Sequence, residues 1–389
     1  MRLLSKALRD LGLATLALCA AGGAPAFAKT FVYVSNAQDG NIDAYTLDTS
    51  SGTLTSIGKV DAGKLVMPMA VSPNKKVLYA VMRSDPFRVA TYAINPETGA
   101  LTQKATAPLP DSMPYVSVDA TGRFLFSASY GGDMIAVSPI SESGLVEAAA
   151  IQVIPTGRNA HAILADRTNR FVYVPTLGAN QVLQFLFDAK TGKLLPNDPA
   201  AVPARPGDGP RHLVFSPDNK FLYVLNELTG NVAQFAIDQN KGTLTEVDSV
   251  ASVPSDAGLV PGVAQAPAGS APPSGAAPKA DDRPKIWAAD IQLTPNGKFL
   301  YSTERTLSKI ALFSVAPGTG KLTYVTNFPT EKQPRGIRID PKGTYLVASG
   351  EKSDRLAVYK IDQGNGRLTE INRYPVGNGA NWIEIVESQ

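Results

Sequence analysis

Residues 207–247 read GDGPRHLVFSPDNKFLYVLNELTGNVAQFAIDQNKGTLTEV, and this stretch decides the fold. Apolar residues alternate with other residues in four short runs, and a turn rich in Pro, Asn, Asp or Gly follows each of the first three. This alternation predicts an antiparallel β-meander. A single four-stranded sheet cannot bury both of its faces, so the unit needs copies of itself. The four expected strands are His212–Ser216, Phe221–Leu225, Val232–Ile237 and Leu244–Val247.

The same unit recurs along the chain. Each copy has an apolar strand such as FVYVSN or KFLYVLN, and it ends with a short turn followed by an apolar residue, as in KTGKL and NKGTL. Most spacings between copies lie between 46 and 50 residues, and one is 78. A period in the mid-forties with four strands per repeat is typical of a β-propeller. The equivalent positions are Tyr33, Tyr79, Phe126, Tyr173, Tyr223, Tyr301 and Val347.

The two ends of the chain determine how the ring closes. An innermost strand precedes every copy except the first, which begins at Phe31. The missing strand is found at the other end of the chain, as Asn381–Ile385. Pairing these two segments would remove the open sheet edges. We therefore expect an all-β fold, a seven-bladed β-propeller of four-stranded antiparallel blades whose C-terminal strand completes the N-terminal blade.

Residues 1–28 have the pattern of a secretory signal peptide. Three basic residues precede a short apolar run at 11–21, and Ala26-Phe27-Ala28 forms a small-x-small cleavage site. Cleavage after Ala28 would leave a single propeller domain at 29–389 in the periplasm or outside the cell. The alternative is a lipoprotein signal cleaved before Cys19. In either case the pattern predicts export.

Composition excludes several classes of function. Cys19 is the only cysteine, so a chain cleaved after residue 28 has no disulfide, thiolate catalyst or thiolate metal ligand. Its net charge is about +1, which offers no electrostatic field for nucleic acid or for an anionic membrane. We expect a monomer that uses no cofactor and no metal.

The spacing of 78 residues contains an insertion at 253–285 that is rich in Pro, Ala and Gly. This composition without periodicity predicts a flexible loop. The loop connects an outermost strand to the next innermost strand, so it emerges on the same rim as the loops between second and third strands. It is either a tolerated surface insertion or a lid over a site.

That rim also collects the unusual side chains. Antiparallel pairing places the start of each innermost strand beside the end of the second strand, so residues distant in sequence can converge at the channel mouth. The starts supply His161, Arg211, His212 and Arg335, and the ends supply Arg83, Tyr130, Glu227, Arg305 and Glu351.

These residue types suit the binding of an anionic group or an oxyanion next to a group that can carry a proton. Arginine offers a charged fork for a carboxylate, a phosphate or an oxyanion. Glu227 is either a general base for water or the partner that neutralises an arginine. His161 is the other candidate base, since its ordinary pKa lies near neutrality. Taken singly, each of these residues has a structural alternative, namely a hydrogen-bonded histidine or a salt bridge between blades. The sequence lacks the serine-elbow, zinc and phosphate-loop motifs.

Three segments resemble the seven-bladed propeller lactonase family. They are GPRHLVFSPDNKFLYVLNE (209–227), WAADIQLTPNGKFLYSTER (287–305) and QPRGIRIDPKGTYLVASG (333–350). This family includes the bacterial 6-phosphogluconolactonase of propeller type and the fungal carboxymuconate lactonizing enzyme. The resemblance implies a lactone as the small-molecule substrate and four catalytic residues, with four more expected to bind substrate. The catalytic set is His161, Arg211, Glu227 and Arg305, and the substrate-binding set is His212, Arg335, Arg83 and Tyr130.

The resulting hypothesis is an exported hydrolase of a sugar lactone. Export favours an unphosphorylated aldonolactone, because phosphosugar lactones are scarce outside the cytosol. Two alternatives remain at this point: a propeller that binds a protein or glycan without catalysis, and a cycloisomerase of muconate-type diacids that runs the ring-closing reaction.

Overall fold

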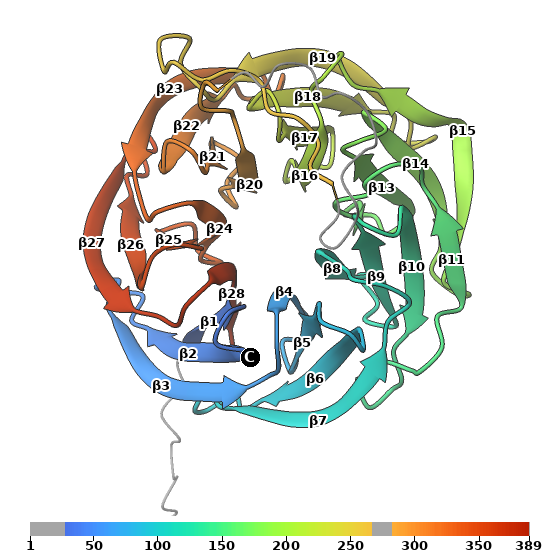
Figure 1. Cartoon of the computed structure of the whole chain (residues 1–389), viewed down its shortest axis with the longest axis vertical. Helices are drawn as coiled ribbons and strands as arrows, with labels where there is room; N and C mark the ends of the chain where they lie inside the picture. Colours follow the sequence, from blue (N-terminus) through green and yellow to red (C-terminus); the bar gives the residue numbers. More distant parts are fainter. Residues whose placement is uncertain (1–27, 267–281, 389) are drawn as a thin grey trace, which may run out of the picture.

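The computed structural model describes residues 28–266 and 282–388, and every regular element in these ranges is a strand. The strands form seven four-stranded antiparallel sheets arranged as a ring (Figure 1). The predicted seven-bladed β-propeller is confirmed. The predicted signal peptide, except for Ala28, lies outside the described residues, and so does the centre of the insertion.

In blades 2 to 7 the chain runs from the centre of the ring to its periphery, whereas the innermost strand of blade 1 is the last strand of the chain (Figure 1). Blade 1 contains β28 (Ala380–Glu387), β1 (Thr30–Asn36), β2 (Asn41–Leu47) and β3 (Leu54–Asp61). Blade 2 contains β4 (Val66–Val71), β5 (Val77–Met82), β6 (Arg88–Ile94) and β7 (Leu101–Pro108). Blade 3 contains β8 (Tyr115–Val118), β9 (Phe124–Ser129), β10 (Met134–Pro139) and β11 (Gln152–Pro155). Blade 4 contains β12 (Leu164–Ala165), β13 (Phe171–Thr176), β14 (Gln181–Asp188) and β15 (Lys193–Pro203).

The remaining three blades carry most of the candidate residues. Blade 5 contains β16 (Pro210–Phe215), β17 (Phe221–Asn226), β18 (Asn231–Ile237) and β19 (Leu244–Ala251). Blade 6 contains β20 (Ala288–Leu293), β21 (Phe299–Glu304), β22 (Lys309–Val315) and β23 (Leu322–Pro329). Blade 7 contains β24 (Pro334–Ile339), β25 (Tyr345–Gly350), β26 (Arg355–Ile361) and β27 (Leu368–Pro375).

Blade 1 is built from both ends of the chain. β28 pairs antiparallel with β1, with Val32 opposite Ile385 and Val34 opposite Ile383. All four side chains are buried. The predicted closure of the ring by the C-terminal strand is therefore confirmed, and the strand is longer than the expected 381–385 at both ends.

A hydrogen bond between neighbouring blades explains the repeated tyrosine. The hydroxyl of Tyr223 donates to the carbonyl of Gly320 in the next blade at 2.7 Å, and Tyr173 donates to Gly242 at 2.9 Å. Tyr33, Tyr79 and Tyr301 make the same contact with Gly99, Gly144 and Gly366. Each acceptor lies in the turn between the third and fourth strands of its blade. The repeat therefore encodes the packing between blades as well as the strands.

We expect Gly242→Ala to destabilise the protein strongly. Gly242 has φ +69°, and a Cβ there would overlap the ring of Phe171 in the neighbouring blade. Gly318 is the matched control, since it has φ +76° with open space around it. Both variants carry the backbone strain of about 1–2 kcal/mol, and overpacking adds about 1–3 kcal/mol at Gly242 alone. Urea unfolding measures the difference, and equal stabilities of the two variants would refute the packing argument.

The described arms of the insertion lie on the predicted rim. The amide of Gly262 donates to the carbonyl of Leu228, just after β17, at 2.8 Å. The hydroxyl of Tyr130, just after β9, donates to the carbonyl of Gln265 at 2.8 Å. The insertion therefore reaches from blade 5 toward blade 3 across the rim that bears the candidate residues.

Candidate active site

Three of the four residues expected to be catalytic meet between blades 5 and 6. Pro210 pairs with Asn226 and His212 pairs with Leu225, so Arg211 occupies a bulge in β16. Glu227 follows β17 directly, and Arg305 follows β21. Arg211 Nε lies 2.7 Å from Glu227 Oε2, and Arg305 donates from its terminal nitrogen to Glu227 Oε1 at 2.7 Å. We call Arg211, Glu227 and Arg305 the Arg–Glu–Arg cluster.

The cluster is largely removed from solvent. The side chain of Arg211 is 1% exposed, that of Glu227 10% and that of Arg305 14%. Arg211 also donates to the carbonyl of Ala289, and Arg305 donates to the carbonyl of Trp287 at 3.0 Å. Both acceptors belong to the start of blade 6, so the cluster also joins the two blades.

The pKa values of Arg211 and Glu227 depend on the charges of the other residues in the cluster. Burial lowers the pKa of Arg211 to about 9 even though Glu227 opposes the shift. Burial would raise the pKa of Glu227, but the charges of Arg305 and Arg211 outweigh it and hold that pKa below its usual value. Glu227 is therefore an anion with both oxygens engaged by guanidinium groups. Of its two expected roles, this geometry favours neutralisation of the arginines over general-base catalysis.

Two histidines lie together beside the cluster. The ring centroids of His161 and His212 are 5.3 Å apart in an edge-on arrangement, and Tyr130 packs against His161 at 5.6 Å. Burial, reinforced by the charge of Arg211, holds the pKa of His161 well below its usual value and lowers the pKa of His212 to about 4. Both imidazoles are therefore neutral at neutral pH and available as proton acceptors.

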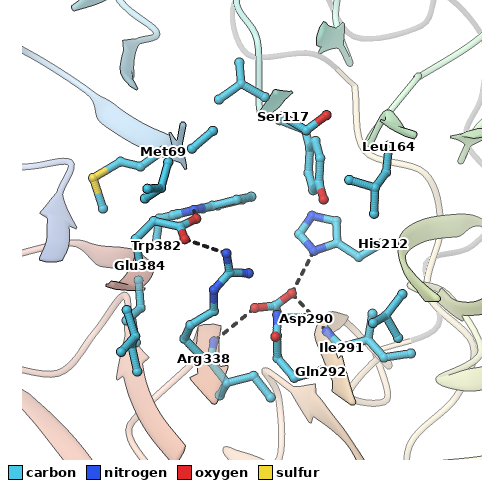
Figure 2. A pocket seen from close by; sticks show the side chains of 18 of the residues that line it. Met69, Ser117, Leu164, His212, Asp290, Ile291, Gln292, Arg338, Trp382 and Glu384 are labelled. Atoms are coloured by element: carbon cyan, nitrogen blue, oxygen red, sulfur yellow. Dashed lines mark hydrogen bonds and ion pairs between the residues drawn. The ribbon is translucent and has the colours of Figure 1, made fainter. Parts of the chain in front are cut away.

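Asp290 is a site residue that the sequence analysis missed. It lies in β20 of blade 6, and its Oδ1 is 3.0 Å from His212 Nδ1 (Figure 2). Its position in the block WAADI corresponds to that of His212 in GPRHL, each on the innermost strand of its blade. That alignment was the available signal, because equivalent positions of adjacent blades are neighbours in a ring.

The other expected binding residues surround this centre. Arg335 is the second residue of β24, keeps 20% of its side chain exposed and pairs with Glu351 at 3.2 Å. Its charge acts on Arg211, His161 and His212, which places it near all three. Arg83 donates from Nε to Ser112 Oγ at 3.0 Å.

A cavity of about 290 Å³ lies next to His212 on the central axis. Its lining continues along the innermost strands, past Gln292 and the ion pair of Arg338 with Glu384, to Lys75 in the turn between β4 and β5. The indole nitrogen of Trp382 donates to Glu384 at 3.0 Å. This channel cavity therefore extends from His212 toward the rim opposite the Arg–Glu–Arg cluster, and Figure 2 shows His212, Asp290, Arg338 and Trp382 around it.

The described residues match neither the pattern of a metal site nor that of a membrane-spanning helix. Among residues 28–266 and 282–388, no three His, Cys, Asp or Glu side chains are grouped so that they could hold a metal ion. The same part of the chain contains no helix long and apolar enough to cross a bilayer.

Comparison with known proteins identifies the family. The family model for the seven-bladed β-propeller lactonases matches residues 31–385. A protein of Serratia proteamaculans named 6-phosphogluconolactonase is 38% identical over 309 residues, which are 79% of this chain and 84% of the relative. One of the same name from Erwinia tasmaniensis is 39% identical with the same coverage.

A solved structure agrees on the fold. The periplasmic gluconolactonase of Pseudomonas aeruginosa superposes with a TM-score of 0.78 over 93% of this chain and 99% of its own, at 24% identity. The matched region contains all seven blades and all eight of the expected site residues. The chain therefore belongs to the lactonase family of seven-bladed β-propellers.

Proposed function

We propose that the protein hydrolyses a sugar lactone to the corresponding hydroxy acid. The observation that carries this proposal is the placement of two neutral imidazoles beside the buried Arg–Glu–Arg cluster. Ester hydrolysis needs both a proton acceptor for water and a cation for the oxygen that becomes charged. The names of the curated relatives support the same reaction, and they favour it over a non-catalytic propeller or a cycloisomerase.

The arginines would stabilise the transition state. Attack of water on the lactone carbonyl turns its oxygen into an oxyanion, and a guanidinium fixed by Glu227 is positioned before that charge develops. Arg305, which keeps part of its side chain exposed, would contact this oxygen. Arg211, almost fully buried, would contribute through its charge. The fixed carboxylate makes both arginines rigid, so little reorganisation accompanies the reaction.

The remaining residues would hold the substrate. Arg335 and Arg83 are cations on the same rim, suited to the hydroxyls or an anionic group of the sugar. Tyr130 would contact the ligand from the side of the insertion.

We further propose that residues 1–28 direct export and that the insertion forms part of the mouth of the site. The mature protein would then work as a monomer on an unphosphorylated aldonolactone. The name of the Pseudomonas neighbour is compatible with that substrate.

A panel of free and phosphorylated sugar lactones tests the proposal. Hydrolysis releases a proton at neutral pH, so a pH indicator measures the rate above the spontaneous reaction. We expect a free aldonolactone to have the highest kcat/KM and a muconate-type diacid to remain unchanged. Lactone hydrolysis at only the spontaneous rate across the panel would overturn the proposed function. A clear preference for the phosphorylated lactone would instead overturn the assignment of substrate.

A further inference from the structure

We infer that His212, oriented by Asp290, is the proton acceptor of the reaction, and that Asp290 is its positioning residue. This inference rests on the proposed function, because it names the base within the same site. Neither residue was expected in this role from the sequence, which left Glu227 and His161 as the candidate bases.

The geometry of the pair fixes the tautomer of His212. Nδ1 lies 3.0 Å from the carboxylate of Asp290, which can only accept a hydrogen bond when it is ionised. Burial would raise the pKa of Asp290, but the hydrogen bond from His212 and those from two backbone amides outweigh it and lower that pKa. The proton of the neutral ring therefore resides on Nδ1, and Nε2 carries the lone pair.

Nε2 of His212 is buried and has no hydrogen-bond partner within the described residues. A buried acceptor without a donor costs about 1–3 kcal/mol, so such atoms are rare in folded proteins and call for an explanation. The nucleophilic water of the reaction would supply the missing donor. The nucleophile, its base and an orienting third group then form the arrangement seen in other hydrolases.

Asp290 is itself held by two blades. Its Oδ1 accepts the amide of Ile291 at 2.9 Å, and its Oδ2 accepts the amide of Ile337 in blade 7 at 3.0 Å (Figure 2). The carboxylate therefore cannot rotate without breaking backbone hydrogen bonds. His212 reaches it from blade 5, so three adjacent blades define the orientation of the imidazole.

The two rival bases lack this support. Glu227 has both oxygens occupied by guanidinium groups. His161 also has a buried ring nitrogen, Nδ1, without a hydrogen-bond partner within the described residues, but it lacks a carboxylate like the one that orients His212. His161 instead packs edge-on against His212, where it restricts the position of that ring.

The channel cavity offers a source of water on the other side of His212. Tyr115 and Trp382 pack against the imidazole at centroid distances of 5.2 and 5.9 Å. Beyond them the cavity of about 290 Å³ is lined by polar groups such as Gln292 and Arg338. It is roomy and polar enough to hold several water molecules. Because His212 itself lines this cavity, water held there lies beside the imidazole.

In the proposed reaction His212 acts first as a base and then as an acid. Nε2 of His212 takes a proton from water as the oxygen bonds to the lactone carbonyl carbon, and the carbonyl π electrons move to its oxygen. The tetrahedral intermediate collapses, breaks the bond between this carbon and the ring oxygen, and the imidazolium returns its proton to that oxygen. The products are a hydroxyl group and a carboxylic acid, which loses its proton to solvent.

Asp290→Asn is the first test, because it keeps the shape of the residue and removes the charge. The groups that act on His212 are Asp290, Arg211, Arg335 and His161, with Tyr115 in contact. Asp290 is the one that raises the pKa of His212, so its loss makes the base weaker. We expect kcat to fall about 10–100-fold with little change in KM, and the acidic limb of the pH–rate profile to move to lower pH.

Glu384→Gln is the matched control, since it removes another carboxylate of the channel cavity that pairs with Arg338 rather than His212. Its acidic limb should stay at the wild-type pH. Thermal melting of every variant separates misfolding from loss of catalysis. An Asp290→Asn enzyme with wild-type kcat and an unmoved acidic limb would overturn the inference, whereas inactivity of the wild-type protein on all lactones would count against the proposed function instead.

Chemical rescue supplies a readout that a structural role would not produce. His212→Ala should lower kcat at least 10²-fold, and added imidazole should restore part of the rate because the vacated space adjoins the cavity. Imidazole should not rescue His161→Ala. Rescue of His161→Ala but not of a folded His212→Ala would assign the base to His161.

Discussion

Glu227→Ala is expected to destabilise the protein by about 3–5 kcal/mol. The substitution leaves two arginines without their carboxylate in a site where Arg211 is 1% exposed. A buried charge without a partner is costly because water can no longer solvate it. Urea unfolding, followed by tryptophan fluorescence, measures the loss. A variant as stable as the wild type would show that the cluster does not contribute to the fold.

The matched control replaces the whole Arg–Glu–Arg cluster with methionine. Apolar residues of similar volume remove both the attraction and the cost of burying the charges, so such replacements are often nearly neutral. The triple variant Arg211→Met, Glu227→Met and Arg305→Met should therefore be more stable than Glu227→Ala alone. It should nevertheless be inactive. This combination would separate what the cluster does for stability from what it does for the reaction.

Arg305→Ala is expected to reduce kcat about 10²–10³-fold, the effect of removing one fixed donor from a developing oxyanion. Arg305 is the more exposed arginine of the cluster, so its removal leaves the Arg211–Glu227 pair in place. Initial rates measured over a range of concentrations of the lactone with the highest kcat/KM give kcat and KM separately. Arg305→Lys is the control, since it retains the charge but not the planar fork.

We expect Arg305→Lys to recover only part of the rate. The guanidinium of Arg305 donates to both Glu227 and the carbonyl of Trp287, and an ammonium group cannot reproduce that geometry. Full activity of Arg305→Ala, with its fold intact, would remove Arg305 from the mechanism. It would leave Arg211 as the remaining candidate for oxyanion stabilisation.

The fold could be predicted from the sequence because each blade repeats the same local pattern. The alternation of apolar residues predicted the boundaries of β17 and β18 to within one residue. The first repeat lacks the innermost strand that precedes every other repeat, and this gap predicted the position of β28. These signals act over a few residues or recur at a fixed spacing, so a single sequence contains them.

The site was predictable only as a set of positions on one rim. Strand direction placed Arg211 and Glu227 beside each other, but the ion pair of Glu227 with Arg305 depends on how two blades pack. His212 and Asp290 are hydrogen-bonded although they are 78 residues apart in the sequence, with the insertion between them. Aspartate in a strand gives no local signal, so only the alignment of Asp290 with His212 in the repeat could have indicated the orienting carboxylate.

The pairing of β28 with β1 has a consequence for how the protein is made. Six blades consist of consecutive strands, so their hydrogen bonds can form soon after each segment leaves the ribosome. Blade 1 must wait for the last residues of the chain, and bringing such distant ends together carries an entropic cost that grows slowly with chain length. A chain that stops before residue 380 would therefore leave the inner edge of β1 unpaired, and such an edge is a template for association with other chains.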